Sequence, residues 1–163
     1  MGRVSVLLLA AMSLLIGTSA AASDYVLIRK QVTVERPADR VWQQVGGWCA
    51  IAEWLKVACD TVSGTGDLGS VRRLNGVTLE TMVARTDHSY TYWQTAGTMA
   101  AYGYHGTLAA SAVGPRRTML TYTLLYDQAA MPTDAVRASE RARLGTRFTG
   151  ALTAMKQLAE AGQ

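Results

Sequence analysis

The hydrophobic pattern of this 163-residue chain changes near Met131-Pro132 from mostly strand-like to helical, and this change constrains the fold more than any other feature. Before that point, short runs rich in β-branched and aromatic residues alternate with turn signals, which is typical of strands. After it, apolar residues recur every three or four positions and predict one long amphipathic helix with Thr133 as its N-cap. The helical apolar positions are Leu144, Phe148, Leu152, Met155 and Leu158 or Ala159.

The segment before this helix has the composition of one strand, two short helices and six further strands. Residues 25–35 form the first expected strand, and Pro37 then opens the helix PADRVWQQV, which Gly46-Gly47 ends. The stretch AIAEWL predicts the second helix. The remaining strands are expected at residues 57–63, 70–74, 77–86, 90–95, 102–112 and 118–127.

This order predicts an α+β fold. Asn75-Gly76 between two alternating runs is a strong signal for a two-residue hairpin, and the other strands are also separated by short turns. Short turns favour antiparallel neighbours, so we expect a curved antiparallel sheet of about seven strands. Because a sheet must bury its apolar face, we expect it to curl around the closing helix.

The first 22 residues have the features of a secretory signal peptide. Arg3 supplies a basic start, residues 4–16 are apolar, and Ala20-Ala21-Ala22 offers a small-residue cleavage site. The apolar run is too short to span a bilayer, so we expect cleavage, no stable membrane insertion afterwards, and a periplasmic or secreted protein; an uncleaved anchor is the alternative. Residues 23–163 are then expected to form a single ligand-binding domain.

The positive charge of the chain is modest and does not indicate a nucleic-acid partner. The formal net charge is +4, and the arginines that crowd the last helix lack interleaved aromatic residues or a nucleic-acid motif. We therefore interpret them as a solvated helix face. They are Arg137, Arg141, Arg143 and Arg147.

Cys49 and Cys59 are the only cysteines. In an exported chain an even cysteine count favours a disulfide, and the C-x9-C spacing is not that of a zinc site. His88 and His105 lie far along the chain, so we expect no metal. A disulfide over ten residues would stabilise the fold by about 2–3 kcal/mol, whereas a reactive thiol pair or a metal site is the alternative.

Several motifs, in order and spacing, carry a resemblance to a known group of proteins. They are V-T-V-x-x-P-A-D-R-V-W at 32–42, G-S-V-R-R-L at 69–74, Leu79-Glu80, S-Y-T-Y at 89–92 and the last helix. Over essentially the whole of residues 23–163 the chain resembles the START/Bet v 1-like (SRPBCC) helix-grip superfamily, also described as polyketide cyclase/dehydrase and lipid transport. The resemblance implies a helix-grip fold and a small hydrophobic ligand.

Within this superfamily the chain is most similar to the branch that includes the plant abscisic acid receptors. That similarity implies pocket roles for Glu80, Tyr92 and Tyr104, and for Lys56, which lies near the position of a pocket lysine in those receptors. Those receptors close a long loop over their hormone, whereas this chain has only the short Asn75-Gly76 hairpin. Hormone-type gating is therefore not expected here.

Strand alternation independently predicts which side chains face inward. Glu80 shares a face with Met82 and Ala84, while His105 points outward. Gln94 lies on the face of Tyr90 and Tyr92, and Leu124 on that of Tyr122. The predicted ligand-binding residues are Lys56, Glu80, Met82, Tyr90, Tyr92, Tyr104, Leu108, Tyr122, Leu144 and Phe148.

Simpler structural roles compete with these assignments. Trp42, Trp48 and Trp54 are expected to pack in the core or against the cysteine loop, and the tyrosines could be ordinary sheet residues with hydroxyls at the rim. Glu80 could instead pair with Arg72 or Arg73 across the hairpin.

The sequence supports two main functions. We expect an exported protein that binds or carries a small hydrophobic or amphipathic ligand in an internal cavity, without a cofactor. The alternative is a polyketide cyclase, dehydratase or isomerase in which Glu80 is the general base and Tyr92 or Tyr104 donates a hydrogen bond to an enolate. The chain has no glycine-rich phosphate loop, G-x-S-x-G or CxxC motif, so we favour binding over catalysis. An interaction module whose cavity only fills space is a third possibility.

Overall fold

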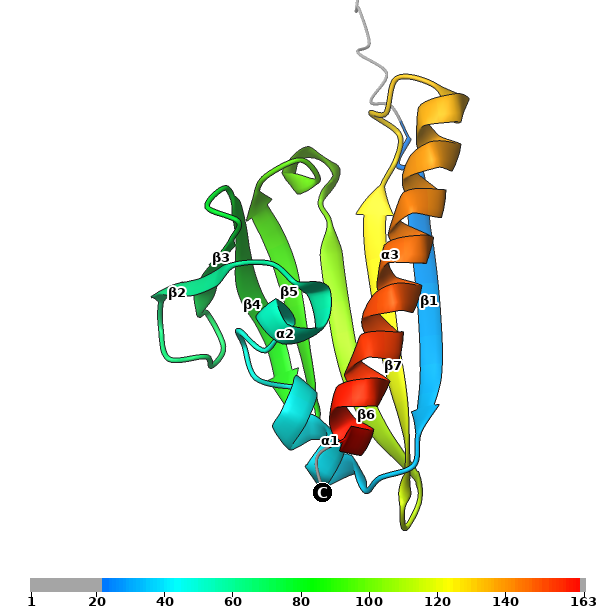
Figure 1. The fold of residues 1–163 in the computed structure, drawn as a ribbon. Coiled ribbons are helices and arrows are strands. Elements are labelled where there is room, and N and C mark those ends of the chain that lie inside the picture. The colour runs from blue at the N-terminus through cyan, green and yellow to red at the C-terminus, as the bar shows by residue number, and fades with distance from the viewer. Residues whose placement is uncertain (1–21, 162–163) are drawn as a thin grey trace, which may run out of the picture.

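The computed structural model describes residues 22–161, which form a curved sheet, two short helices and one long helix (Figure 1). Arg3, residues 4–16 and the Ala20-Ala21 pair of the expected signal peptide lie outside the described residues. The elements run in the order β1 (Tyr25–Val34), α1 (Ala38–Val45), α2 (Ile51–Leu55), β2 (Cys59–Ser63), β3 (Val71–Leu74), β4 (Thr78–Thr86), β5 (Ser89–Ala96), η1 (Ala100–Tyr102), β6 (His105–Gly114), β7 (Arg117–Asp127) and α3 (Asp134–Ala161).

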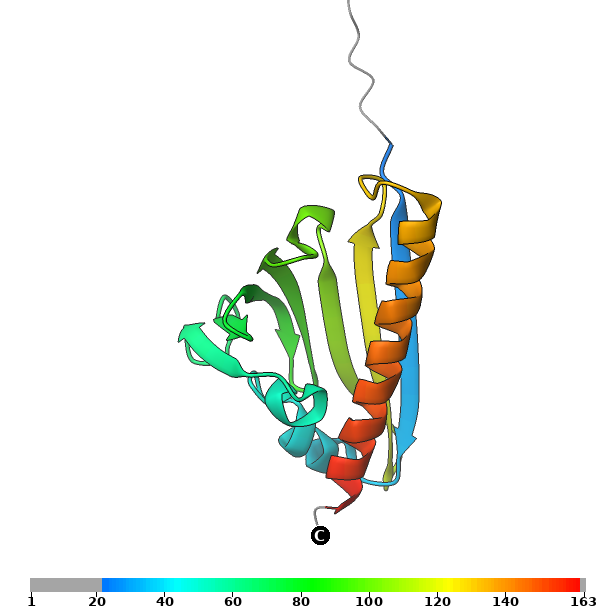
Figure 2. The ribbon, with the colours of Figure 1, turned by 45° about the horizontal axis from the view of Figure 1, so that its top comes forward.

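The sheet has seven strands in the order β1-β7-β6-β5-β4-β3-β2, and every pair of neighbours is antiparallel. The helix α3 packs on β1 and β7 and contacts α1 and α2 at its other side. Figure 2 shows α3 lying along β1 and β7, while β3, β4 and β5 curve away from it. The predicted α+β class and helix-grip architecture are confirmed.

Local sequence signals account for the closing helix. The hydroxyl of Thr133 accepts a hydrogen bond from the Val136 backbone N–H at 3.2 Å, so Thr133 is the N-cap as predicted. The expected apolar stripe is buried, with Ala159 rather than Leu158 as its last fully covered member. From Leu144 onward the helix is held against the sheet by this stripe, because the buried residues of α3 run from Leu144 to Ala159.

Several predicted boundaries were wrong, and the strand expected at 57–63 begins only at Cys59. The strand expected at 102–112 begins only at His105, because Ala100–Tyr102 forms a 3-10 turn and Gly103 takes a left-handed conformation. Pro37 is the residue before α1 rather than part of its first turn. The hairpin loop has three residues rather than two, since Leu74 pairs with Thr78 and Val77 belongs to the turn.

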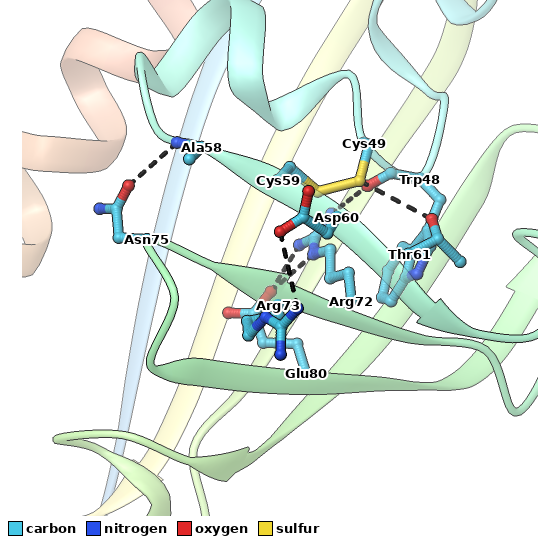
Figure 3. The surroundings of a disulfide bond; sticks show 10 residues. All are labelled: Trp48, Cys49, Ala58, Cys59, Asp60, Thr61, Arg72, Arg73, Asn75 and Glu80. Atoms are coloured by element: carbon cyan, nitrogen blue, oxygen red, sulfur yellow. Dashed lines mark hydrogen bonds and ion pairs between the residues drawn. A yellow bond between two sulfur atoms is a disulfide. The ribbon is translucent and has the colours of Figure 1, made fainter.

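The disulfide predicted between Cys49 and Cys59 is present and joins the start of α2 to the start of β2, with Cα atoms 5.6 Å apart (Figure 3). A second tie fixes the same region, because the Asn75 side chain accepts a hydrogen bond from the Ala58 backbone N–H at 2.9 Å and the Asn75 backbone N–H donates to the Ala58 carbonyl at 3.0 Å. The segment containing α2 is therefore anchored at both β2 and the β3–β4 turn.

Candidate functional site

A cavity of about 210 Å³ lies between the inner face of β3, β4 and β5, the short helix α2 and the middle of α3. Its walls are largely apolar, and its floor is polar. The wall residues are Ile51, Leu55, Val57, Leu74, Met99, Leu144 and Phe148, and the floor residues are Glu80, Tyr92, Gln94 and Tyr104. Exposed side chains surround the opening, namely Asn75, Val77, Thr98, Arg143 and Arg147.

Arg72 and Glu80 form a buried ion pair at the floor. They face each other across β3 and β4, and Glu80 Oε2 lies 2.8 Å from Arg72 Nε and 2.7 Å from Arg72 Nη2 (Figure 3). The exposed fractions of the two side chains are 0% and 5%. Because neither charge reaches bulk water, each depends on the other for compensation.

The Arg72 guanidinium is further enclosed by backbone and aromatic groups. Its Nη1 donates to the Trp48 carbonyl at 2.5 Å, and its carbon lies 4.1 Å from the Trp48 ring centre and 5.0 Å from that of Tyr92. Such placement over aromatic faces stabilises a desolvated cation. Arg72 therefore connects the cysteine loop, which carries Trp48, to the cavity floor.

The pair sets the charge state of the floor. Burial raises the pKa of Glu80 above its ordinary value, although the adjacent Arg72 opposes this shift. Burial by itself would lower the pKa of Arg72, but Tyr90 and Glu80 raise it beyond its usual range, so the guanidinium stays charged. A protonated Glu80 would leave Arg72 as an uncompensated buried cation, so the pair is ionised and has no net charge near neutral pH.

One oxygen of Glu80 remains available to a ligand. Both contacts with Arg72 use Oε2, whereas Oε1 accepts no hydrogen bond from any residue in the range 22–161. Since Glu80 lines the cavity, Oε1 can accept a hydrogen bond from a molecule placed there.

The tyrosines of the floor are neutral hydrogen-bonding groups. Tyr122 donates its hydroxyl proton to the Tyr92 hydroxyl at 3.0 Å, and the Tyr92 and Tyr104 rings lie 6.2 Å apart. Burial raises the pKa of Tyr92, Tyr104 and Tyr122, so all three keep their protons at physiological pH. Gly106 makes room for this arrangement, because a Cβ at that position would overlap the Tyr92 ring.

The structure divides the predicted ligand-binding residues into three groups. The cavity is lined by Glu80, Tyr92, Tyr104, Leu144 and Phe148. Behind this lining, the apolar core contains Met82, Tyr90, Leu108 and Tyr122. Lys56 is exposed at the end of α2, in a left-handed conformation, and is not part of the lining.

Sequence reasoning left Arg72, Arg143, Arg147 and Gln94 out of the site. Alternation had already put Gln94 on the inner face, and the hairpin register put Arg72 opposite Glu80, so these two signals were present in the sequence. Glu80 was predicted either to line the pocket or to pair with an arginine across the hairpin. In the structure it does both, because it lines the cavity and pairs with Arg72. Arg73 instead lies 3.9 Å from Asp60 at the surface.

The tryptophans and histidines have structural positions. Trp54 donates to the Val45 carbonyl at 3.3 Å, and Trp42 packs near Tyr90. His88 lies 2.8 Å from Asp39, and His105 stacks on Trp93 on the outer face of the sheet.

Residues 22–161 contain neither a side-chain cluster suited to a metal ion nor a helix suited to a bilayer. No group of three or more histidine, cysteine, aspartate or glutamate residues is arranged to hold a metal ion in this range. Nor does any helix of the same range combine the length and apolar character needed to cross a bilayer.

An open antiparallel sheet that grips a long C-terminal helix beside an internal cavity defines the helix-grip class of proteins. The chain belongs to the polyketide cyclase / dehydrase and lipid transport family, whose model matches residues 26–160. Among curated protein sequences, none is significantly similar to this chain.

Solved structures with the same fold include two enzymes. The ZhuI aromatase/cyclase from Streptomyces sp. R1128 is 19% identical with a TM-score of 0.70, and the match covers 84% of this chain and 94% of that chain. Norcoclaurine synthase from Thalictrum flavum, in complex with dopamine and hydroxybenzaldehyde, is 16% identical with a TM-score of 0.65 and 98% of both chains covered. The crystal structure of Ara h 8.0201 is 13% identical with a TM-score of 0.62, and the match covers 85% of this chain and all of the other. At these identities the likeness shows the fold alone.

Proposed function

We propose that this protein binds or carries a small hydrophobic or amphipathic molecule in the cavity between β3–β5, α2 and α3. The observation that carries this proposal is the arrangement of the lining, in which apolar walls enclose a floor where Glu80 Oε1 is free to accept a hydrogen bond. Apolar walls with a few oriented polar groups are typical of small-molecule sites. The family match supports a ligand of this kind.

The cavity volume limits the size of the ligand. A cavity of about 150 Å³ lined by apolar side chains holds one benzene molecule, so a cavity of about 210 Å³ accommodates one substituted aromatic ring or a comparable head group. Burial of its apolar surface would contribute about 25 cal/mol per Å², less the cost of ordering. The floor would orient its polar end.

We also propose that the protein is exported before it binds its ligand. The basic and apolar start of the chain supports this proposal, and so does the disulfide, because such bonds persist in oxidising compartments. Mass measurement of the mature chain tests it directly. A mass that matches a chain beginning at residue 23 supports export. A full-length chain found in the cytoplasm contradicts it.

Native mass spectrometry of protein purified from its own host, without detergent or organic solvent, tests the binding proposal. A discrete added mass that leaves on denaturation would identify the ligand class by accurate mass. An unloaded protein that binds no compound from an extract of the same host would contradict the proposal.

A pair of matched substitutions locates the site once a ligand is known. Tyr104→Phe removes a hydroxyl that lines the cavity, whereas Tyr90→Phe removes a buried hydroxyl that does not. We expect weaker binding only for Tyr104→Phe. Equal affinities in both variants would place the ligand elsewhere.

A second function is favoured by the same floor. Glu80 has an unengaged oxygen and a pKa that burial raises, so it could take a proton from a carbon next to a ligand carbonyl while Tyr104 donates a hydrogen bond to the enolate oxygen. Incubation of the identified ligand with the protein in D2O tests this idea. Deuterium gained at that carbon, and reduced in Tyr104→Phe, would indicate an enzyme. Release of an unchanged and undeuterated ligand would indicate a carrier.

A further inference from the structure

Two arginines of α3 line the opening of the cavity. Arg143 and Arg147 are one helical turn apart, and the residue that follows each of them, Leu144 or Phe148, reaches into the cavity wall. The same stretch of helix therefore supplies both apolar wall and positive charge to the site.

The two guanidinium groups differ in their partners. Arg143 is engaged by Glu140, whose Oε2 lies 2.8 Å from Arg143 Nε and whose Oε1 contacts Nη2. Among residues 22–161, Arg147 has no ion-pair partner and no hydrogen-bond acceptor. Arg147 is therefore the charge at the opening that a ligand can engage without displacing a protein group.

The interior does not neutralise Arg147. Glu80 is the one carboxylate among the lining residues in the described part of the chain, and Arg72 already compensates its charge. Arg147 nevertheless acts on the floor, since burial raises the pKa of Glu80 and first Arg72, then Arg147, opposes that rise. The site thus runs from a neutral polar floor, past apolar walls, to an uncompensated cation.

We propose that Arg147 binds an anionic group of the ligand at the opening of the cavity, so that the site takes a small, largely apolar molecule with a carboxylate or phosphonate-like end. The inference rests on the proposed binding function and names the class of ligand. Guanidinium groups bind such anions through paired, charge-assisted hydrogen bonds. A cationic ligand would meet Arg147 at the opening and find no free carboxylate charge at the floor.

Three probes of similar size and different charge test the proposal. They are 3-phenylpropanoate, its neutral amide and 2-phenylethylphosphonate, with affinities measured by calorimetry. We expect the carboxylate or the phosphonate to bind about tenfold more tightly than the amide, a preference that corresponds to one charge-assisted contact. The stronger of the two anions then indicates which acid group the site selects. The preference should shrink as salt concentration rises, because Arg147 is exposed.

Three single substitutions separate a direct contact from a general effect of charge. In Arg147→Gln we expect the anion preference to fall to within about twofold, while amide affinity is retained. Arg116→Gln removes the same charge from the exposed β6–β7 turn, which does not line the cavity, and should leave the preference unchanged. Arg143→Gln should have a smaller effect than Arg147→Gln, because Glu140 already engages Arg143.

The outcomes distinguish this inference from the proposed function. Equal binding of acid and amide by the unmodified protein, or an anion preference that survives in Arg147→Gln, would overturn the role of Arg147 and leave the cavity as a binding site. Failure of all three probes to bind would overturn both proposals for ligands of this size.

Discussion

The two halves of the sheet differ in the residues that line their buried inner faces. Along β1, β6 and β7 the inner face is buried and largely apolar, as at Leu108, Leu120 and Leu124. The ring centres of Tyr122 and of Phe148 in α3 lie 4.4 Å apart. Along β3, β4 and β5 the inner face also carries the buried polar residues Arg72, Glu80 and Gln94. Core residues lie in both halves, but the second half also borders the cavity. We therefore call β1, β6 and β7 the core half and β3, β4 and β5 the cavity half.

The cover over each half explains the difference. The 28-residue helix α3 packs on β1 and β7, whereas β3 to β5 face the five-residue helix α2 across the cavity. A short cover leaves volume unfilled, so charged side chains persist there only because they pair with each other. The cavity therefore lies beside the strands on which α3 does not pack.

The largest effect is expected from separating the buried ion pair of the cavity half. Arg72→Met leaves Glu80 buried without its partner and should lower the free energy of unfolding by about 3–5 kcal/mol. Replacing both residues, as in Arg72→Met with Glu80→Leu, should recover most of this loss. Urea unfolding of the two single variants and the double variant measures the coupling, and additive losses would contradict it.

The pH dependence of the Arg72→Met variant sharpens the same test. Without the guanidinium, burial raises the pKa of Glu80 further above its ordinary value of 4.5. The folded state then binds a proton more strongly than the unfolded state, so stability should fall as pH rises above the unfolded pKa. Urea unfolding midpoints at several pH values check this, and a flat profile in the variant would contradict it.

An identical leucine truncation in each half compares their packing directly. Leu124 is fully buried in the core half, so Leu124→Ala should lower the free energy of unfolding by an amount toward the upper end of about 2–5 kcal/mol. Leu74→Ala borders an existing cavity, so fewer contacts are lost and the loss should lie toward the lower end. Thermal and urea unfolding measure both values. Equal losses would show that the two halves are packed alike.

Reduction of Cys49–Cys59 should destabilise the cavity half by a smaller amount. The closed loop has ten residues of separation, which corresponds to about 2–3 kcal/mol in the chain-entropy account. Ligand affinity should also fall, because Ile51 and Leu55 of the cavity wall lie inside this loop. Unfolding with and without reductant measures the change, and a Cys49→Ala, Cys59→Ala variant should not respond to reductant. Two free thiols in the untreated protein would contradict the disulfide.

The smallest effect is expected in the core half, at Asp127. Its carboxylate accepts backbone hydrogen bonds from Ala129 and Asp24, both at 2.9 Å, and these bonds lower the pKa of Asp127 below its ordinary value of 3.8. The resulting stability is present above the unfolded pKa and is lost as pH falls through the lower folded pKa. Asp127→Asn should therefore reduce the acid dependence of unfolding below about pH 4. An unchanged acid profile would contradict this.

The prediction of the fold from sequence succeeded where signals are local. The hydroxyl of Thr133 and the turn at Asn75-Gly76 act within a few residues of themselves, and strand alternation placed Tyr92 and Gln94 on the buried face. The strand start expected at residue 102 was wrong, since the 3-10 turn at Ala100–Tyr102 gives no clear signal against a strand in a run of small and aromatic residues.

The candidate site was predicted only in part, because its geometry depends on distant segments. Alternation identified Glu80 and Tyr104 as inward residues but could not distinguish cavity lining from filled core, so Tyr90 and Leu108 were grouped with them. That distinction depends on how far α2 and α3 lie above the strands. The alternation of residues within one strand carries no information about this helix-to-strand distance.

The sequence by itself determined the element order, the curved antiparallel sheet and the cysteine pair, because periodicity, turn residues and composition express short-range physics. The tertiary structure alone decided that Trp48 packs against Arg72 and that Arg147 reaches the opening of the cavity. These relations join segments that are far apart in the chain, and they exist only once packing has set the space between helix and sheet.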